Sequence, residues 1–186
     1  MKLLKNRKIA ILITVILAVA ASVFGVGRSL NRLARDIEVM FYDGVYLDDA
    51  MYTQPGIEAH LKNRLNSALA FAAMMEDFPE AKNETETLLS ARNTLISAND
   101  ISEKYDANRA LDSAYWFLYE KANSLELTKR DEDDIAQFTS TFAGAQNAIN
   151  DSLYNQKALS FMDNASFFAK ILKPFAFVTP PQIFAE

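Results

Sequence analysis

The sequence contains no cysteine and a single histidine, His60. Without cysteine there is neither a disulfide framework nor a lipid-modified cysteine anchor, and the redox compartment stays unspecified. With one histidine, and no serine motif beside it, we expect no His-based metal site, no catalytic triad and no di-iron centre with two Glu-x-x-His pairs. His60 is therefore expected to be an ordinary helix-surface or packing residue.

Glycine loops that bind phosphate and clusters of basic residues are also missing. Residues 28–186 hold 15 of the 19 basic side chains and all 24 acidic ones, a formal charge of −9. We expect no nucleic-acid partner, because binding phosphates needs clustered lysine and arginine. An enzyme is disfavoured, because its general base would have to be a strongly perturbed carboxylate or lysine. The sequence predicts no catalytic, cofactor-binding or metal-binding residue.

The most informative feature that is present is a run of 18 residues from Ile9 to Val26, which carries no charge and only Thr14 and Ser22 as polar side chains. As a helix with a rise of about 1.5 Å per residue, it spans roughly 27 Å, close to the roughly 30 Å hydrocarbon core of a bilayer. We predict that residues 1–27 form a transmembrane anchor that crosses the membrane once, which places the protein at the cell membrane.

A cleaved signal peptide is the alternative, because a basic start, an apolar core and the triplet Ala18-Val19-Ala20 also fit that template. The anchor is favoured because the apolar run continues to Val26. Basic residues flank the run on both sides, and their bias favours an N-terminus inside the cell and a domain outside it. They are Lys2, Lys5, Arg7 and Lys8 before the run, and Arg28, Arg32 and Arg35, among Asp36 and Glu38, after it.

Apolar side chains recur every three or four residues in successive segments of the remaining chain, and no segment alternates with period two long enough for a strand. The striped segments are 30–51, 57–75, 88–95, 105–122 and 135–153. The pattern predicts an all-α fold, in which the transmembrane helix is followed by an antiparallel bundle of about four long helices. The spacing is close enough to a heptad for coiled-coil-like packing.

Helix boundaries follow from residue type. The first stripe is expected to stop at Pro55-Gly56, with Gly44 as a weak point, because proline cannot continue a helix. Asp100 or Ser102 is a candidate N-cap for the fourth segment, and Thr128 for the fifth.

The predicted domains are the anchor 1–27, a helical bundle 28–163, and a C-terminal segment 164–186 with a short helix and a tail rich in phenylalanine and proline. The tail is too short and too broken to span a membrane. Two placements remain open. The tail either lies at the membrane interface or the membrane-facing end of the bundle, or it folds over the bundle's own core. Its apolar and proline residues include Phe167, Phe168, Pro174, Phe175, Phe177, Pro180, Pro181 and Phe184.

Local clusters have mostly structural interpretations. The acidic run 131–134 lacks the glycine and ligand spacing of a calcium loop, and we interpret it as the first turn of a helix capped by Thr128. Asp48-Asp49, between Tyr46 and Tyr52, is interpreted as a solvated face, with a binding edge as the alternative.

The remaining clusters also have structural interpretations or match a pattern by chance. Core packing is the expected role of the Phe71, Met74, Met75 and Phe78 group, with docking of a partner helix as the alternative. Asn83, Asn150 and Asn164 begin chance-level matches to the glycosylation pattern.

The chain resembles the LemA family of bacterial membrane-anchored helical proteins. The resemblance rests on Tyr154-Asn155, Ala158 and Phe161, on the apolar segment 168–172, on the ending Phe184-Ala185-Glu186, and on Leu61-Lys62-Asn63-Arg64 with Asn66 and Leu69. Met162 and Asp151 depart from the family pattern, the proline that the family usually carries after its last helix is not matched, and Pro55-Gly56 interrupts a helix that is commonly continuous. The resemblance implies a single-pass protein with a helical bundle, and no catalytic residues.

The sequence favours a non-enzymatic, membrane-tethered scaffold that presents its helical faces to protein partners or to further copies of itself. Tethering raises local concentration and lets weak contacts matter. The alternatives are a chemoreceptor-like sensory bundle and a secreted binding protein whose signal peptide is cleaved.

Overall fold

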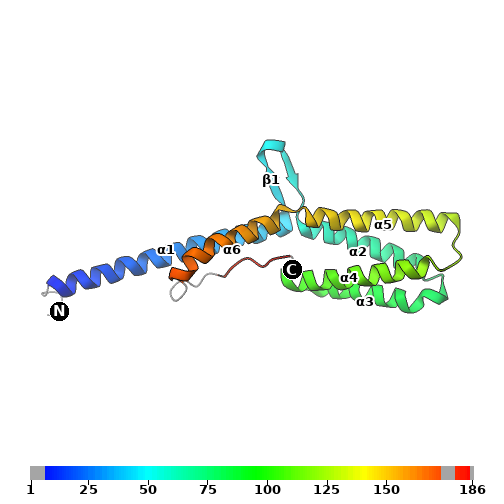
Figure 1. The fold of residues 1–186 in the computed structure, drawn as a ribbon, viewed down its shortest axis with the longest axis horizontal. Coiled ribbons are helices and arrows are strands. Elements are labelled where there is room, and N and C mark those ends of the chain that lie inside the picture. Colours follow the sequence, from blue (N-terminus) through cyan, green and yellow to red (C-terminus); the bar gives the residue numbers. More distant parts are fainter. Residues whose placement is uncertain (1–6, 173–178, 185–186) are drawn as a thin grey trace. The chain divides into compact units, whose positions relative to one another are not determined.

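The computed structural model describes residues 7–172 and 179–184 (Figure 1). The predicted all-α fold is confirmed, with an apolar N-terminal helix and a packed helical bundle. The elements are α1 (Arg7–Asp43), β1 (Val45–Leu47), η2 (Asp48–Ala50), β2 (Tyr52–Gln54), α2 (Ile57–Met75), η3 (Pro79–Ala81), α3 (Lys82–Ser97), α4 (Ile101–Ala122), α5 (Lys129–Asn150) and α6 (Leu153–Leu172).

The chain forms two compact units. Unit 1 consists of Met1–Glu38 and Lys157–Pro181, and unit 2 of Val39–Gln156 and Gln182–Glu186. Helices α1 and α6 therefore each contribute to both units.

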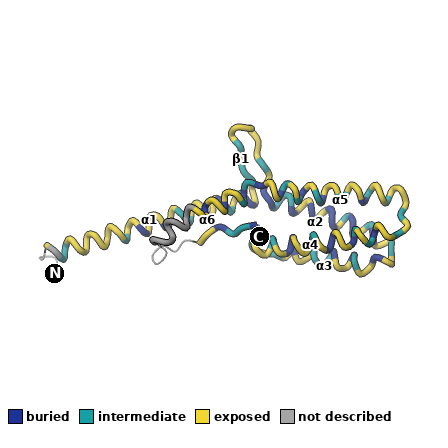
Figure 2. The backbone as a smooth tube through the Cα atoms, viewed as in Figure 1, coloured by how far each residue is buried: buried dark blue, intermediate teal, exposed yellow. Residues whose placement is uncertain are grey.

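Unit 1 contains the apolar part of α1. Helix Ile9–Asp43 is long and apolar enough to cross a membrane by length and composition, and only 6% of its most apolar stretch is buried. Figure 2 shows this part of α1 exposed along most of its length. Thr14 and Ser22 do not leave their hydroxyls unsatisfied, because each donates to the carbonyl four residues earlier in the helix.

Unit 2 contains the bundle of α2 to α5. Short turns join successive helices, which therefore run antiparallel (Figure 1). Helix α2 packs against α5 and α3, and α3 packs against α4. The apolar stripes meet in the core of the bundle. Its fully buried large side chains include Ile57, Phe71, Met75, Leu88, Leu111, Tyr115, Leu118, Phe142 and Ile149.

Both predicted N-caps are present. The Asp100 carboxylate accepts a hydrogen bond from the Glu103 N–H at 2.8 Å. Thr128 forms a reciprocal capping box with Asp131, in which Thr128 Oγ1 accepts from the Asp131 N–H at 3.3 Å and Asp131 Oδ2 accepts from the Thr128 N–H at 3.1 Å. Each cap satisfies N–H groups that a helix start leaves without a partner inside the helix.

Two boundaries differ from the sequence prediction. The first helix does not continue to Pro55 but ends at Asp43, and an antiparallel hairpin follows, in which Val45 pairs with Gln54. Gly44 has φ +88°, a left-handed conformation that turns the chain out of the helix. The strands have three residues each, too few to show a period-two pattern, so the apolar periodicity does not indicate the hairpin.

The second difference lies at Leu153. The stripe expected to run from residue 135 through Leu153 is broken, because α5 ends at Asn150 and Leu153 begins α6. The Gln54 side chain bridges the break, donating to the Asp151 carbonyl at 3.4 Å and accepting from the Leu153 N–H at 3.2 Å. Ser152 Oγ accepts from the Tyr154 N–H at 3.3 Å. The break is therefore hydrogen-bonded through side chains, which a hydrophobic stripe does not reveal.

Gly44→Ala is expected to destabilise unit 2 by about 1–3 kcal/mol, because the residue needs a left-handed φ. A Cβ atom there would also lie 2.1 Å from the Gln54 carbonyl oxygen. Gly144→Ala is the matched control. It lies within α5 with open space around it, so it should stabilise the helix by about 0.5–1 kcal/mol. Urea unfolding curves of the two variants should move in opposite directions, and a shared direction would contradict the prediction.

Candidate functional site

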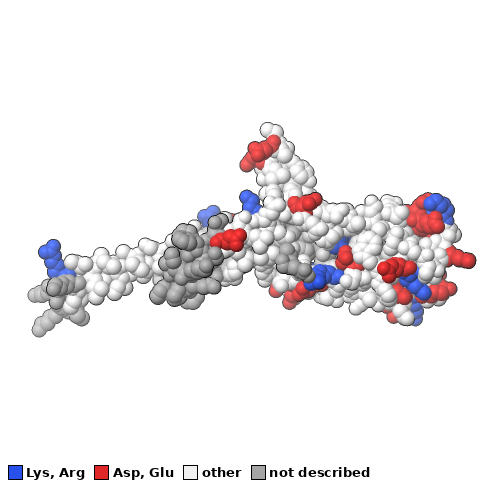
Figure 3. Space-filling model, viewed as in Figure 1, with Lys and Arg blue, Asp and Glu red and all other residues white. Residues whose placement is uncertain are grey.

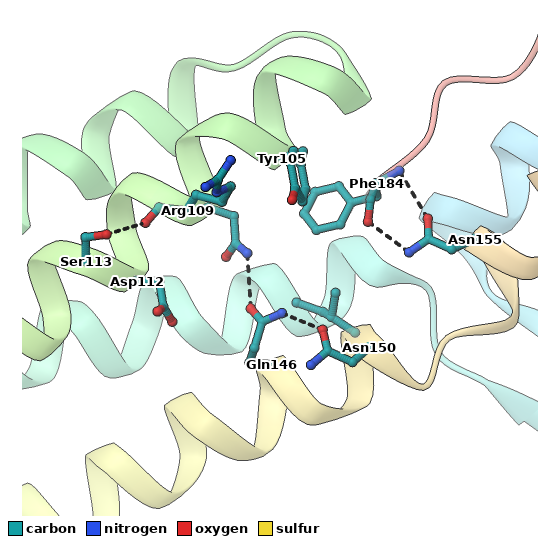
Figure 4. A pocket seen from close by; sticks show the side chains of 10 residues that line it. Tyr105, Arg109, Asp112, Ser113, Gln146, Asn150, Asn155 and Phe184 are labelled. Carbon is teal, nitrogen blue, oxygen red and sulfur yellow. Dashed lines mark hydrogen bonds between the residues drawn. The ribbon is translucent and has the colours of Figure 1, made fainter. Parts of the chain in front are cut away.

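The candidate functional site is a cleft of about 610 Å³ in unit 2, between α4 and α5 (Figure 4). Its α4 side is formed by Tyr105, Asn108, Arg109, Asp112 and Ser113, and its α5 side by Gln146, Ile149 and Asn150. Asn155 of α6 and Phe184 complete it. Spacings of three and four place the α4 residues on one face of that helix, and the same holds for the α5 residues.

Carboxamide side chains form a continuous row in the cleft. Asn108 Nδ2 donates to Gln146 Oε1 at 3.1 Å, and Gln146 Nε2 donates to Asn150 Oδ1 at 2.8 Å. Asn108 is only 3% exposed, and its Oδ1 atom has no hydrogen-bond partner in the described part of the chain. A buried acceptor without a partner costs about 1–3 kcal/mol, so this end of the row is an incomplete polar site.

The last described residues of the chain form one end of the cleft. Asn155 binds the main chain of Phe184 in both directions, since its Nδ2 donates to the Phe184 carbonyl at 2.8 Å and its Oδ1 accepts from the Phe184 N–H at 3.1 Å. The Tyr154 hydroxyl donates to the Gln182 carbonyl. The Phe184 ring is buried and meets the Tyr105 ring edge to face, with 5.4 Å between centroids. Figure 4 shows the two Asn155–Phe184 hydrogen bonds and the neighbouring rings of Tyr105 and Phe184.

Gln182 connects the same segment to the start of α4. Its Oε1 atom accepts from the N–H groups of Ile101 at 2.8 Å and Ser102 at 3.2 Å, which α4 leaves unpaired. For residues 182–184 the structure thus shows contacts with the bundle's own unit. Pro174, Phe175 and Phe177 lie outside the described residues, as do the side chains of Phe167 and Phe168.

Arg64 of α2 lies beside the cleft wall. Its side chain is fully buried, its guanidinium lies 4.0 Å from the centroid of the Phe142 ring, and it is paired with Asp112. Burial lowers the Arg64 pKa, while the Asp112 charge acts in the opposite direction. Nε and Nη1 of Arg64 have no hydrogen-bond partner among the described residues. Arg64 follows Leu61 by three residues and precedes Ala68 by four, and this place on the apolar stripe is the sequence signal of its burial.

Tyr115 stacks on the opposite side of the same aromatic cluster. Its ring is 3.8 Å from the Phe142 ring, centroid to centroid and nearly parallel, and its hydroxyl lies 3.2 Å from Thr139 Oγ1. Burial raises the pKa of Tyr115 to about 12. Arg64 and Tyr115 therefore both pack against the Phe142 ring in the core of the bundle.

The clusters considered in the sequence lie elsewhere. His60 is half-buried on α2, where burial lowers its pKa. The acidic run begins α5, where Lys129 pairs with Asp133 at 2.9 Å. No group of three or more His, Cys, Asp or Glu side chains within residues 7–172 and 179–184 is placed to hold a metal ion.

Two further clusters have clear positions. Phe71 and Met75 are fully buried, as the core-packing interpretation predicted, and Met74 and Phe78 are partly exposed. Tyr46 and Tyr52 are exposed on the hairpin, with Asp48 and Asp49 between them. Of the three glycosylation matches, Asn150 lines the cleft, Asn83 is exposed on α3, and the Asn164 side chain lies outside the description.

Comparison with known proteins finds no matching family model, no matching curated protein and no matching solved structure. The cleft must therefore be interpreted from its own chemistry. Its lining offers carboxamides, an aromatic edge and one side chain of each charge, and the Ser113 hydroxyl donates to the Arg109 carbonyl at 3.1 Å. These groups suit noncovalent recognition of a polar, uncharged ligand.

Removing Asp112 should be more harmful than removing Arg64. Asp112→Ala leaves the buried guanidinium without its charge partner, and we expect the free energy of unfolding to fall by about 2–4 kcal/mol. The expected loss is below that of a fully buried pair because Asp112 itself is 40% exposed. Arg64→Met removes the charge and fills most of the space, so it should cost about 1 kcal/mol or less. Denaturant unfolding of both variants tests the order, and the reverse order would refute this account of the buried charge.

The raised pKa of Tyr115 predicts that the folded protein loses stability at alkaline pH. The unfolded side chain ionises near pH 10 and the folded one near pH 12, so its contribution is complete below pH 10 and is lost as the pH rises to 12. Two pKa units correspond to about 3 kcal/mol. Unfolding free energies between pH 9 and 12, roughly the window of this shift, should fall more steeply for the wild type than for Tyr115→Phe. Parallel curves would exclude Tyr115 as the cause.

Proposed function

We propose that the chain is a membrane-anchored, non-enzymatic helical-bundle protein that binds protein partners at the cell envelope. The observation that carries this proposal is the exposed apolar surface of α1. Leu17 and Phe24 are 63% and 69% exposed, and seven further large apolar residues between Ile11 and Val26 are also exposed. Each such side chain gains about 1.5–3 kcal/mol on leaving water, and lipid hydrocarbon provides that environment.

The charge distribution supports the same proposal. The run from Ile9 to Val26 has no acidic or basic side chain, and on the face that Figure 3 shows the bundle surface carries many. Basic residues on both sides of the apolar run fit a helix that crosses once, with the N-terminus inside and the bundle outside. A tethered bundle meets envelope partners at raised local concentration, so modest contacts suffice for binding.

Membership of the LemA family is part of this proposal. Its support is that residues quoted for the resemblance at distant positions touch one another in the structure. Asn155 holds the Phe184 main chain, and Tyr154 bonds to Gln182 in the same segment. If Tyr154 and Asn155 hold the C-terminal segment against the end of the bundle, this contact explains why the family pattern contains both Tyr154-Asn155 and the ending at Phe184.

A secreted binding protein is the second candidate. The observation that favours it is the position of the apolar helix near the start of the chain, where a signal sequence passes the same test of length and composition. In that case the bundle and its cleft act after release.

The deciding measurement is the mass of the protein recovered from membranes, combined with protease access from outside intact cells. We expect an uncleaved N-terminus, resistance to extraction at alkaline pH, and digestion of the bundle from outside. Leu12→Arg with Leu17→Arg should move the protein to the soluble fraction, because each charge at the helix centre costs about 2.5–3.5 kcal/mol. Thr87→Arg, on the exposed surface of α3, is the control and should stay in the membrane.

A mass that corresponds to cleavage after Ala20 would replace the anchor with the secreted candidate. An uncleaved protein in the soluble fraction would remove both candidates.

A further inference from the structure

A carboxamide side chain carries the same donor and acceptor as a peptide bond, and can pair with main chain in both directions. Asn155 does this with Phe184, through hydrogen bonds of 2.8 Å and 3.1 Å. The bound segment is therefore held as a neighbouring strand in a sheet would hold it, with a side chain in place of the strand. The cleft already demonstrates one mode of recognition, in which an amide side chain pairs with both the N–H and the C=O of one main-chain residue.

The row of carboxamides extends this chemistry beyond Asn155. At one end, Asn108 Oδ1 is buried and has no partner among the described residues. At the other end, exposed Asn150 accepts from Gln146 through its oxygen, which leaves its amino group to donate to a ligand. The row thus presents an acceptor and a donor, the pair that an extended peptide uses along each edge.

The rest of the lining favours an uncharged chain. Arg109 and Asp112 carry opposite charges, and Asp112 is already paired with the buried Arg64, so the lining holds no cluster of like charge that would select an ion. The edge of Tyr105 against Phe184 offers apolar surface for a ligand side chain. The volume of about 610 Å³ lies within the range of about 300–1,000 Å³ that is usual for ligand sites.

We propose that this cleft binds an extended segment of a partner polypeptide, recognised through its main chain by Asn108, Gln146 and Asn150. The proposal rests on the function proposed above and names the ligand class of its binding site. The side chain of the segment that faces Tyr105 and Phe184 is apolar. A main-chain N–H of the segment donates to Asn108 Oδ1, which has no partner among the described residues.

The test uses the full chain in detergent micelles and the capped pentapeptide acetyl-Ala-Val-Phe-Val-Ala-amide, whose β-branched residues favour extended backbone. Titration is followed through the ¹⁵N side-chain resonances of Asn108, Gln146 and Asn150. We expect saturable shifts of these amides. An ester analogue, with the central N–H groups replaced by oxygen, should bind at least tenfold more weakly, because it cannot donate to an unpaired acceptor.

Asn108→Leu should weaken peptide binding at least tenfold, while the control Asn93→Leu, on the exposed surface of α3, should bind as the wild type does. If Asn108→Leu fails to fold, Asn150→Ala tests the exposed end of the row, with the same expected loss. Equal affinity of the cleft variants and the wild type would overturn the proposal.

A carbohydrate can use the same amides, so tri-N-acetylglucosamine is titrated in parallel. Shifts caused by the sugar and not by the peptide would overturn the proposal, as would the absence of shifts with either probe. The titration does not depend on membrane location. Peptide binding by a protein that proves soluble would refute the anchor alone, and no binding by an anchored protein would refute the peptide site alone.

Discussion

The buried guanidinium of Arg64 restricts how the helices of the bundle can be placed against one another, more than it adds to their stability. It belongs to α2, stacks on Phe142 of α5 and pairs with Asp112 of α4, so one side chain joins three helices. A buried charge is stable in few positions, because both its charge partner and its aromatic neighbour must lie within contact distance. Asp112 and Asn108 lie one turn apart on α4, and the same contact therefore fixes the wall of the cleft.

Polar groups that bind the chain to itself are concentrated at one end of unit 2. Gln54 bridges the break between α5 and α6, Gln182 caps α4, and Asn155 holds Phe184. Each uses a carboxamide where regular structure leaves backbone groups without partners. The bundle is thus closed by side-chain amides at this end, and by the Thr128 capping box at the start of α5.

The helices can be predicted from the sequence, because apolar periodicity and capping residues are local signals. Asp100 and Thr128 mark starts that the structure confirms. The hairpin after Gly44 cannot be predicted from these patterns, since it depends on one residue with a left-handed φ and on strands of only three residues. The cleft was hidden for a different reason. Asn108, Gln146 and Asn150 are ordinary helix-surface residues until α4 and α5 are packed, and Asn155 meets Phe184 across 29 residues of chain.

The cap that Gln182 places on α4 has a consequence for the order of folding. Gln182 is synthesised 81 residues after Ile101, whose N–H group it satisfies. At a synthesis rate of about 5–20 residues per second, the start of α4 waits several seconds for this cap. The four helices of the bundle emerge before the segment that closes them. During synthesis the amide end of the bundle is therefore the last part to be completed. Until Gln182 has emerged, the start of α4 stays exposed to solvent.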